Sequence, residues 1–199
     1  ALPWLILCGG LLLTAFVTAL LGRAIRRRDE ALRIARQRTS ELERRTREDS
    51  LTGIYNRRHF SELLAHELGR GGEGVAVLLL DLDHFKRVND QLGHLAGDRV
   101  LQTTAARLST SLRGSECLAR WGGEEFAVLV PRIGRDDAMA LAERLRASIG
   151  SAPFEAGDEH LPLTISVGVA LAADGLHTAD QLVAAGLEGL MGHFDHGAV

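Results

Sequence analysis

Arg120-Trp121-Gly122-Gly123-Glu124-Glu125-Phe126 is the stretch around which the fold of this chain is organised. Apolar residues flank it on both sides, so it predicts two strands joined by a tight Gly-Gly turn. Glycine accepts the positive φ angles of such a turn, and it leaves no side chain between the backbone and a ligand. Two carboxylates follow directly. A turn that a phosphate can approach, beside acids that can hold a divalent cation, indicates nucleotide chemistry.

A second acid lies at the end of a neighbouring predicted strand. The apolar run Val75–Leu80 predicts a buried strand, and it ends at Asp81. A carboxylate at the end of such a strand is costly unless positive charge meets it. We therefore expect Asp81 and Glu124, together with the carbonyl of Leu82, to hold one or two Mg²⁺ ions.

The adjacent acids of the predicted hairpin should contribute unequally. Strand residues alternate between the two faces of a sheet, so Glu124 and Glu125 should point in opposite directions. Glu124 lies nearest the turn, and we favour it as the principal ligand and proton acceptor, with Glu125 as the second candidate. The alternative is that these acids are solvated strand ends, ion-paired with Arg120.

Several side chains suited to a nucleotide follow Asp81. Lys86 is the only lysine of the chain, and its distance from the strand end suits a point charge that reaches a phosphate. Asn89, His94 and Asp98 follow it in a predicted loop and helix start. An amide and a carboxylate can together read the edge of a guanine. For Asn89 and Asp98 taken singly, turn formation and helix capping are the alternatives.

The rest of the chain alternates between helical and strand patterns, which predicts an α/β (α+β) fold with a mixed central sheet flanked by helices. Further apolar periodicity predicts a strand over Leu163–Leu171 and helices that begin near Asn56 and extend over about Gly97–Leu112, Asp136–Ile149 and Ala179–Met191.

The N-terminal part has a different composition. Residues 1–22 carry no charge, and about 20 helical residues at about 1.5 Å each span a bilayer core. Arginines follow at once, which predicts a single-pass helix in the inner (cell) membrane with the remainder in the cytoplasm. A cleaved signal peptide would need basic residues ahead of the apolar run, and a buried core helix is the other alternative.

Residues 23–48 contain neither glycine nor proline and show a weak, arginine-rich heptad pattern. They predict a helical stalk, either as a coiled coil or as a solvated single helix that touches anionic lipid. Residues 49–199 form the predicted catalytic domain. The net charge of −3 gives no indication of a nucleic-acid partner. The two cysteines, Cys8 and Cys117, are too sparse for a disulfide framework and fit a reducing cytoplasm.

Segments spread over most of this domain resemble the GGDEF family of diguanylate cyclases. They occur in that family's order and are DSLTGIYNRR (Asp49–Arg58), DLDHFKRVND (Asp81–Asp90), GHLAGDRVL (Gly93–Leu101), RWGGEEF (Arg120–Phe126) and TISVGVA (Thr164–Ala170). The resemblance implies an adenylyl-cyclase-like, palm-like domain. It also implies that two facing subunits each bind one GTP and produce cyclic di-GMP and pyrophosphate.

The resemblance also implies roles for individual residues. Mg²⁺ or Mn²⁺ would be held by Asp81, the Leu82 carbonyl and Glu124, with Glu125 assisting. The guanine and phosphate contacts that it implies are Asn89, His94 and Asp98 at the base, and Phe85, Lys86, Gly122 and Gly123 at the phosphates, with Lys86 stabilising charge in the transition state.

Two departures from the family pattern stand out. Arg113 and Glu116 occupy the place of an inhibitory Arg-x-x-Asp product site, although a surface helix end is an alternative. Phe194 stands where the family has a lysine near the C-terminus. The nearby Gly186, Gly189 and Gly192 should weaken the last helix, each by about 1 kcal/mol relative to alanine.

The sequence therefore supports a membrane-anchored, homodimeric diguanylate cyclase. The alternative is a degenerate module that binds GTP or cyclic di-GMP without turnover and acts as a signalling receptor.

Overall fold

The structure is a computed structural model and describes residues 47–71, 74–156 and 159–194. Over these ranges five strands form one sheet in the order β1-β3-β4-β2-β7. The strands are Tyr55–Asn56 (β1), Ala76–Leu82 (β2), Cys117–Gly122 (β3), Glu125–Val130 (β4) and Ile165–Leu171 (β7). β1 runs parallel to β3, whereas the other neighbours are antiparallel, so the mixed sheet predicted from the sequence is confirmed.

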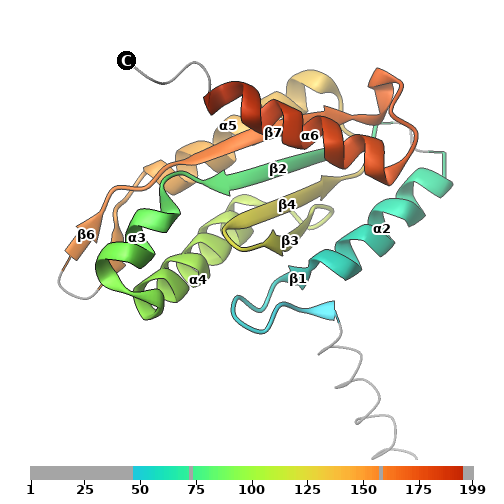
Figure 1. Cartoon of the computed structure of the whole chain (residues 1–199). Coiled ribbons are helices and arrows are strands. Elements are labelled where there is room, and N and C mark those ends of the chain that lie inside the picture. Colours follow the sequence, from blue (N-terminus) through green and yellow to red (C-terminus); the bar gives the residue numbers. More distant parts are fainter. Residues whose placement is uncertain (1–46, 72–73, 157–158, 195–199) are drawn as a thin grey trace, which may run out of the picture. The chain divides into compact units, whose positions relative to one another are not determined.

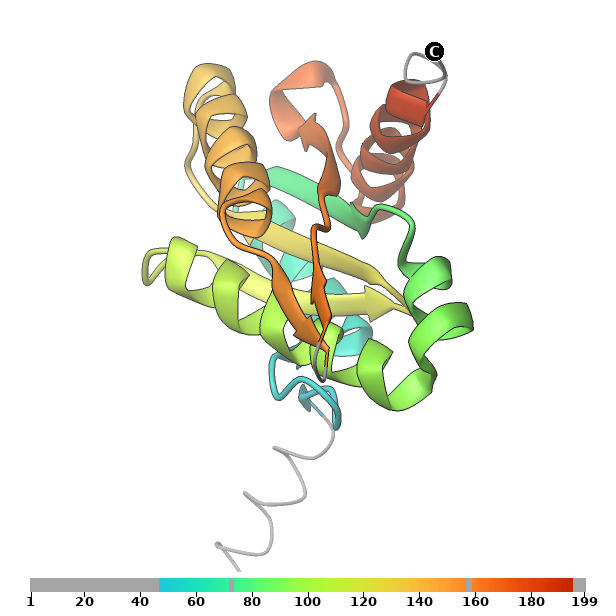
Figure 2. The same cartoon turned by 90° about the vertical axis from the view of Figure 1, so that its left-hand side faces the viewer.

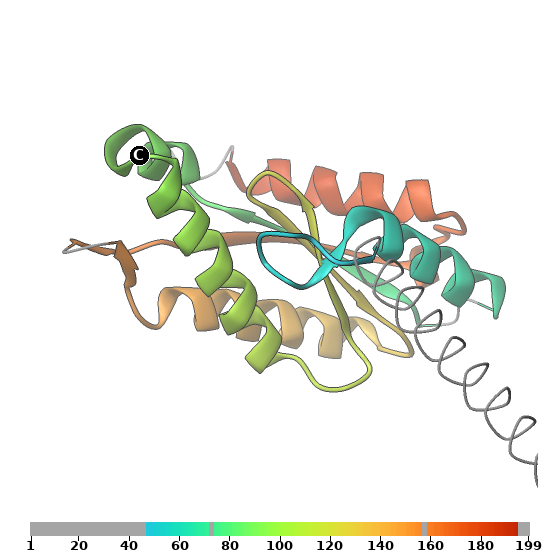
Figure 3. The ribbon, with the colours of Figure 1, turned by 90° about the horizontal axis from the view of Figure 1, so that it is seen from below.

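Helices cover both faces of this sheet (Figures 1 and 2). One face is covered by α2 (Arg57–Gly69) and α6 (Ala179–Phe194), and the other by α4 (His94–Ser111) and α5 (Arg135–Gly150). The interior strand β2 is apolar from Ala76 to Leu80 because both of its faces are buried there. Leu78 and Leu80 pack with α4 and α5, whereas Leu79 packs with α2 and α6. The view from below shows the sheet between these two layers (Figure 3).

Some elements were not predicted from the sequence. The residues after β2 form a short helix, α3 (Phe85–Leu92), where the sequence predicted a loop, and α4 begins at His94 rather than Gly97. Two turns of helix are too short for apolar periodicity to be detected. The further unpredicted elements are β1, the hairpin of β5 (Phe154–Ala156) and β6 (Glu159–Leu161), and the 3₁₀ turn η1 (Ala172–Asp174).

The glycines of α6 have a packing role that the sequence did not reveal. A Cβ atom built on Gly168 of β7 would lie 2.0 Å from the carbonyl oxygen of Gly186, and one built on Gly189 would lie 3.3 Å from the Cα of Gly168. The helix backbone therefore lies directly on the strand. Gly186 and Gly189, which were expected to weaken the helix, thus also allow this close approach.

The predicted membrane helix (residues 1–22) and stalk (residues 23–48) lie almost wholly outside the described residues. Within the part that the structure describes, none of the helices has the length and apolar character needed to cross a bilayer.

Candidate functional site

The hairpin turn lies one residue later than predicted. Gly122 is the last residue of β3 and pairs with Glu125, and a register shift follows Arg120. The two turn residues are thus Gly123 and Glu124, and only Gly123 has a positive φ, 52°. Both glycines are exposed, and a Cβ on Gly123 would meet no atom within 4 Å. Their backbone is therefore open to an approaching ligand.

This turn brings its acids to the end of β2. Asp81 lies directly across from Glu125 in the β2–β4 pairing, and Glu124 precedes it in the turn. Burial, and then the negative charges of Glu124 and Glu125, raise the pKa of Asp81 to about 6 from 3.8. Because Glu124 lies in the turn, the prediction that strand alternation sends the two glutamates to opposite faces does not apply to it. The negative charges of both glutamates raise the pKa of Asp81.

The chemistry of these acids fits a divalent cation. Asp81 is half-buried, and neighbouring carboxylates raise its pKa. A bound cation would supply the positive charge that stabilises its ionised form. The described ranges contain no ready group of three His, Cys, Asp or Glu side chains that could hold a metal. Mg²⁺ is commonly bound by one or two carboxylates together with substrate phosphates, so it does not need such a group.

Arg120 does not neutralise these acids, contrary to the alternative considered from the sequence. Its Nη1 lies 3.2 Å from Oδ1 of Asp49, and its Nε and Nη2 donate to the carbonyl oxygen of Gly123 at 3.1 and 2.8 Å. Burial acts to raise the pKa of Asp49, but hydrogen bonds from Thr52 and the charge of Arg120 bring it below its ordinary value. Arg120 therefore ties the hairpin turn to the loop that opens the domain.

The residues predicted to read guanine lie on two consecutive helices. Asn89 is in the last turn of α3 and Asp98 in the second turn of α4, and neither helix has a side-chain cap, so the capping alternative is not supported. Gly97 allows Asn89 to lie against the start of α4, since a Cβ there would be 2.1 Å from Oδ1 of Asn89. His94, the first residue of α4, is exposed. This role of Gly97 could not be predicted from the sequence.

The two residues predicted to meet phosphates differ in exposure. Lys86 is exposed on the first turn of α3, as a phosphate-binding cation requires. Phe85 is only 6% exposed and packs in the core between the sheet and α4. A contact of Phe85 with a substrate would therefore be made by its backbone.

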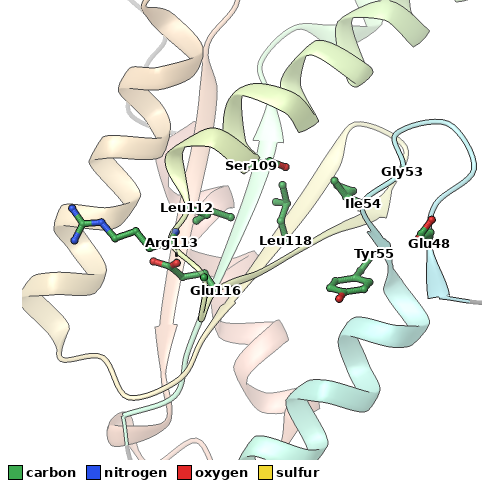
Figure 4. Close-up of a pocket in the computed structure, with 10 residues that line it drawn as sticks. Glu48, Gly53, Ile54, Tyr55, Ser109, Leu112, Arg113, Glu116 and Leu118 are labelled. Atoms are coloured by element: carbon green, nitrogen blue, oxygen red, sulfur yellow. Dashed lines mark hydrogen bonds between the residues drawn. The ribbon is translucent and has the colours of Figure 1, made fainter. Parts of the chain in front are cut away.

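Arg113 and Glu116 lie together at the rim of a cavity of about 400 Å³, which Tyr55, Ile54 and Leu118 also line (Figure 4). The Glu116 carboxylate curls back and accepts a hydrogen bond from the backbone N–H of Arg113. The Arg113 side chain extends away from Tyr55 and Leu118. The longer glutamate thus binds its own loop.

The family described as "Diguanylate cyclase, GGDEF domain" matches residues 46–188. The chain is 46% identical over 124 residues to diguanylate cyclase DgcP of Pseudomonas aeruginosa, covering 61% of this chain and 18% of DgcP. It is 40% identical over 152 residues to cyclic di-GMP phosphodiesterase NbdA of the same organism, covering 74% of this chain and 19% of NbdA.

Solved structures agree with the fold. The coiled coil and GGDEF domain of DgcB from Caulobacter crescentus, in complex with c-di-GMP, superposes with a TM-score of 0.80 at 26% identity. The match covers 89% of this chain and 95% of the chain in that structure. The chain spans about a fifth of the length of the relatives DgcP and NbdA. It belongs to the GGDEF domain family, whose members related to it include diguanylate cyclases.

Proposed function

We propose that this chain is a diguanylate cyclase, which condenses two GTP molecules into cyclic di-GMP and releases pyrophosphate. The observation that carries the proposal is the group of acids where β2 meets the β3–β4 turn, in which burial and the charges of Glu124 and Glu125 raise the pKa of Asp81 to about 6. The similarity to DgcP supports the same activity.

The acids would hold Mg²⁺ or Mn²⁺ through Asp81, the Leu82 carbonyl and Glu124, with Glu125 assisting. A bound ion would acidify the attacking ribose 3′-hydroxyl and offset the charge on the α-phosphate and pyrophosphate. Glu124 would accept the 3′-hydroxyl proton. Its place in the exposed turn, beside the open backbone of Gly123, suits that role.

The remaining residues would bind and orient GTP. Lys86 would stabilise negative charge that develops on the phosphates, because charge placed in advance costs no reorganisation during the reaction. Asn89 and Asp98 would read the guanine edge, with His94 beside them. Each subunit of a homodimer would present one GTP, so association of two chains would supply the reactive geometry.

We also propose that residues 1–22 anchor the protein in the inner membrane, with the catalytic domain in the cytoplasm and residues 23–48 as the connecting stalk. The uncharged run and the arginines that follow it support this orientation.

A second candidate is a module that binds GTP or cyclic di-GMP without turnover. Phe194, at the end of α6, favours it, because the family's lysine at that place carries a charge that phenylalanine lacks. The relative NbdA, which is named a phosphodiesterase, also shows that a chain similar to this one occurs in a protein named for a different activity.

One assay separates these candidates. The full chain, purified in detergent, is incubated with GTP and Mg²⁺, and nucleotides are resolved by chromatography. The proposal expects cyclic di-GMP that disappears when the metal is chelated. Nucleotide binding in calorimetry without product would establish the binding module instead.

A further inference from the structure

Asp83 lies immediately after β2 and is held by the edge strand β7. Its backbone N–H donates to the carbonyl oxygen of Thr164 at 3.1 Å. Its Oδ1 accepts a hydrogen bond of 2.7 Å from the hydroxyl of Ser166, and its Oδ2 accepts one from the hydroxyl of Thr164. One carboxylate oxygen is therefore bonded to β7 and the other to Thr164, the residue before it. The backbone bond extends the β2–β7 pairing one residue beyond the last registered pair, Leu82 with Ile165.

The segment that Asp83 fixes carries groups on which the proposed reaction depends. Leu82 precedes it, and Lys86 follows it in the first turn of α3. Between them His84 has a φ of 59°, the left-handed region that few residues other than glycine adopt. The chain thus makes a sharp turn here. The three hydrogen bonds of Asp83 attach that turn to the sheet and hold it in place.

The charge of Asp83 is not required to bond both hydroxyls, because the oxygen of a neutral amide accepts from one hydroxyl and its NH2 group donates to the oxygen of the other. No ion pair is recorded for Asp83 among the residues that the structure describes. Ser166 is the direct cross-strand partner of Asp81, and its hydroxyl donates to Asp83, so the Asp83 carboxylate lies on the same side of the sheet as Asp81 and places its negative charge there. Since both of its oxygens already accept a hydrogen bond, the role of Asp83 is to add negative charge near Asp81 rather than to coordinate an ion.

Thr164 and Ser166 belong to the TISVGVA segment, for which the proposed chemistry has no other use. Thr164 is exposed and Ser166 half-buried, so neither hydroxyl needs Asp83 to avoid an unsatisfied buried group. Both hydroxyls donate a hydrogen bond to Asp83, and this is the contact that they share.

We propose that Asp83 is a positioning residue for the site, a role that rests on the proposed function. Its carboxylate, held by Thr164 and Ser166, fixes the turn from Leu82 to Lys86 against β7. The same carboxylate strengthens the attraction of a divalent cation to Asp81 without coordinating it.

Two variants of the full chain separate charge from position. Asp83→Asn removes the charge but keeps a hydrogen-bonding group for each hydroxyl, an oxygen that accepts and an NH2 group that donates. The dissociation constant for Mn²⁺ is obtained from the electron paramagnetic resonance signal of the free ion. In Asp83→Asn it should rise roughly three- to tenfold, as expected for loss of one charge near the ion.

Thr164→Val combined with Ser166→Ala keeps the charge but frees the carboxylate. This variant should bind Mn²⁺ within roughly twofold of wild type but bind a non-hydrolysable GTP analogue at least roughly fivefold more weakly, because the turn is loosened.

Asp90→Asn is the matched control, since Asp90 is an exposed acid on the same helix α3. It should leave both dissociation constants unchanged. Unaltered Mn²⁺ binding in Asp83→Asn would overturn the electrostatic role, and unaltered GTP-analogue binding in the hydroxyl variant would overturn the positioning role. Both readouts are binding measurements. A wild-type chain that binds Mn²⁺ and the analogue but makes no product would therefore refute the cyclase proposal alone, whereas one that binds neither would refute both.

Discussion

Arg120 joins Asp49 to the turn that carries Glu124. A single guanidinium lies 3.2 Å from the Asp49 carboxylate and donates twice to the carbonyl oxygen of Gly123. Asp49 in turn accepts hydrogen bonds from the backbone N–H and hydroxyl of Thr52 at 3.0 and 2.7 Å. The loop at the start of the domain and the acid-bearing turn are therefore one hydrogen-bonded unit, although they lie 71 residues apart in the chain.

Breaking this unit should destabilise the domain. Arg120→Lys cannot maintain contacts with both Asp49 and Gly123. The side chains of Arg120 and Asp49 are only 18% and 21% exposed, so the lost contacts are not replaced fully by water. We expect a loss of about 1–3 kcal/mol in the free energy of unfolding by urea. A double-mutant cycle with Asp49→Asn should show coupling of at least about 0.5 kcal/mol. Arg146→Lys, in the exposed pair with Glu143, is the control and should cost under about 0.5 kcal/mol. Equal losses at the two sites would contradict this account.

Removing either principal acid should abolish turnover. Asp81→Asn and Glu124→Gln keep the size of each side chain but remove the charge that would hold the ion, so the rate of cyclic di-GMP formation should fall by at least roughly a hundredfold. Glu62→Gln, at an exposed position on α2 paired with Arg58, should leave the rate unchanged. A near wild-type rate in either site variant would remove that residue from the metal assignment.

The stability of the metal-free protein should depend on pH through Asp81. Because its pKa is raised to about 6 from 3.8, the unfolded chain releases this proton at a lower pH than the folded chain does. Stability contributed by the protonated form is thus present below 3.8 and is lost as pH rises through about 6. In EDTA, Asp81→Asn should raise the melting temperature more near about pH 7.5 than near about pH 4. A shift of the same size at both pH values would mean that Asp81 is not perturbed.

Gly97→Ala should weaken GTP binding more than it weakens the fold. The new Cβ would lie 2.1 Å from Oδ1 of Asn89 and 3.1 Å from Cζ of the buried Phe85 ring. The flexible amide can move away, although it then leaves its position for guanine. We expect the KM for GTP to rise roughly tenfold or more. The melting temperature should fall only slightly, because the better helix propensity of alanine offsets part of the tight contact with the Phe85 ring. Gly69→Ala, where a Cβ meets no atom within 4 Å, is the control for the helix effect alone. An unchanged KM in Gly97→Ala would count against Asn89 as a guanine contact.

Gly168→Ala should destabilise the packing of α6 on β7. Its Cβ would lie 2.0 Å from the backbone carbonyl of Gly186, and backbone atoms cannot rotate away as a side chain can. We expect a loss of about 3 kcal/mol or more in chemical denaturation. Gly150→Ala, at the open end of α5, should change stability by less than about 1 kcal/mol. A similar loss in the free energy of unfolding for the two variants would show that α6 does not pack directly on β7.

The longer elements were predictable because their signal is local. The apolar run of β2 and the helical periodicity of α4, α5 and α6 depend on residues that are neighbours in the chain, and the structure confirms an element at each of these places. The acids of the hairpin and Asp81 could also be predicted to meet, since each lies at the end of a recognisable strand. The exact turn could not, because the register shift after Arg120 moved it by one residue.

Sequence alone was sufficient for the family resemblance, the α/β class and the nature of the side chains at the candidate site, because these depend on residue type and short spacing. Tertiary structure alone decided which partner each charge received. Arg120 binds Asp49 rather than the acids, Asp83 is held by hydroxyls of β7, and Gly168 lies under the backbone of Gly186. Contacts of this kind depend on strand order and close packing, which bring together residues that no local pattern connects.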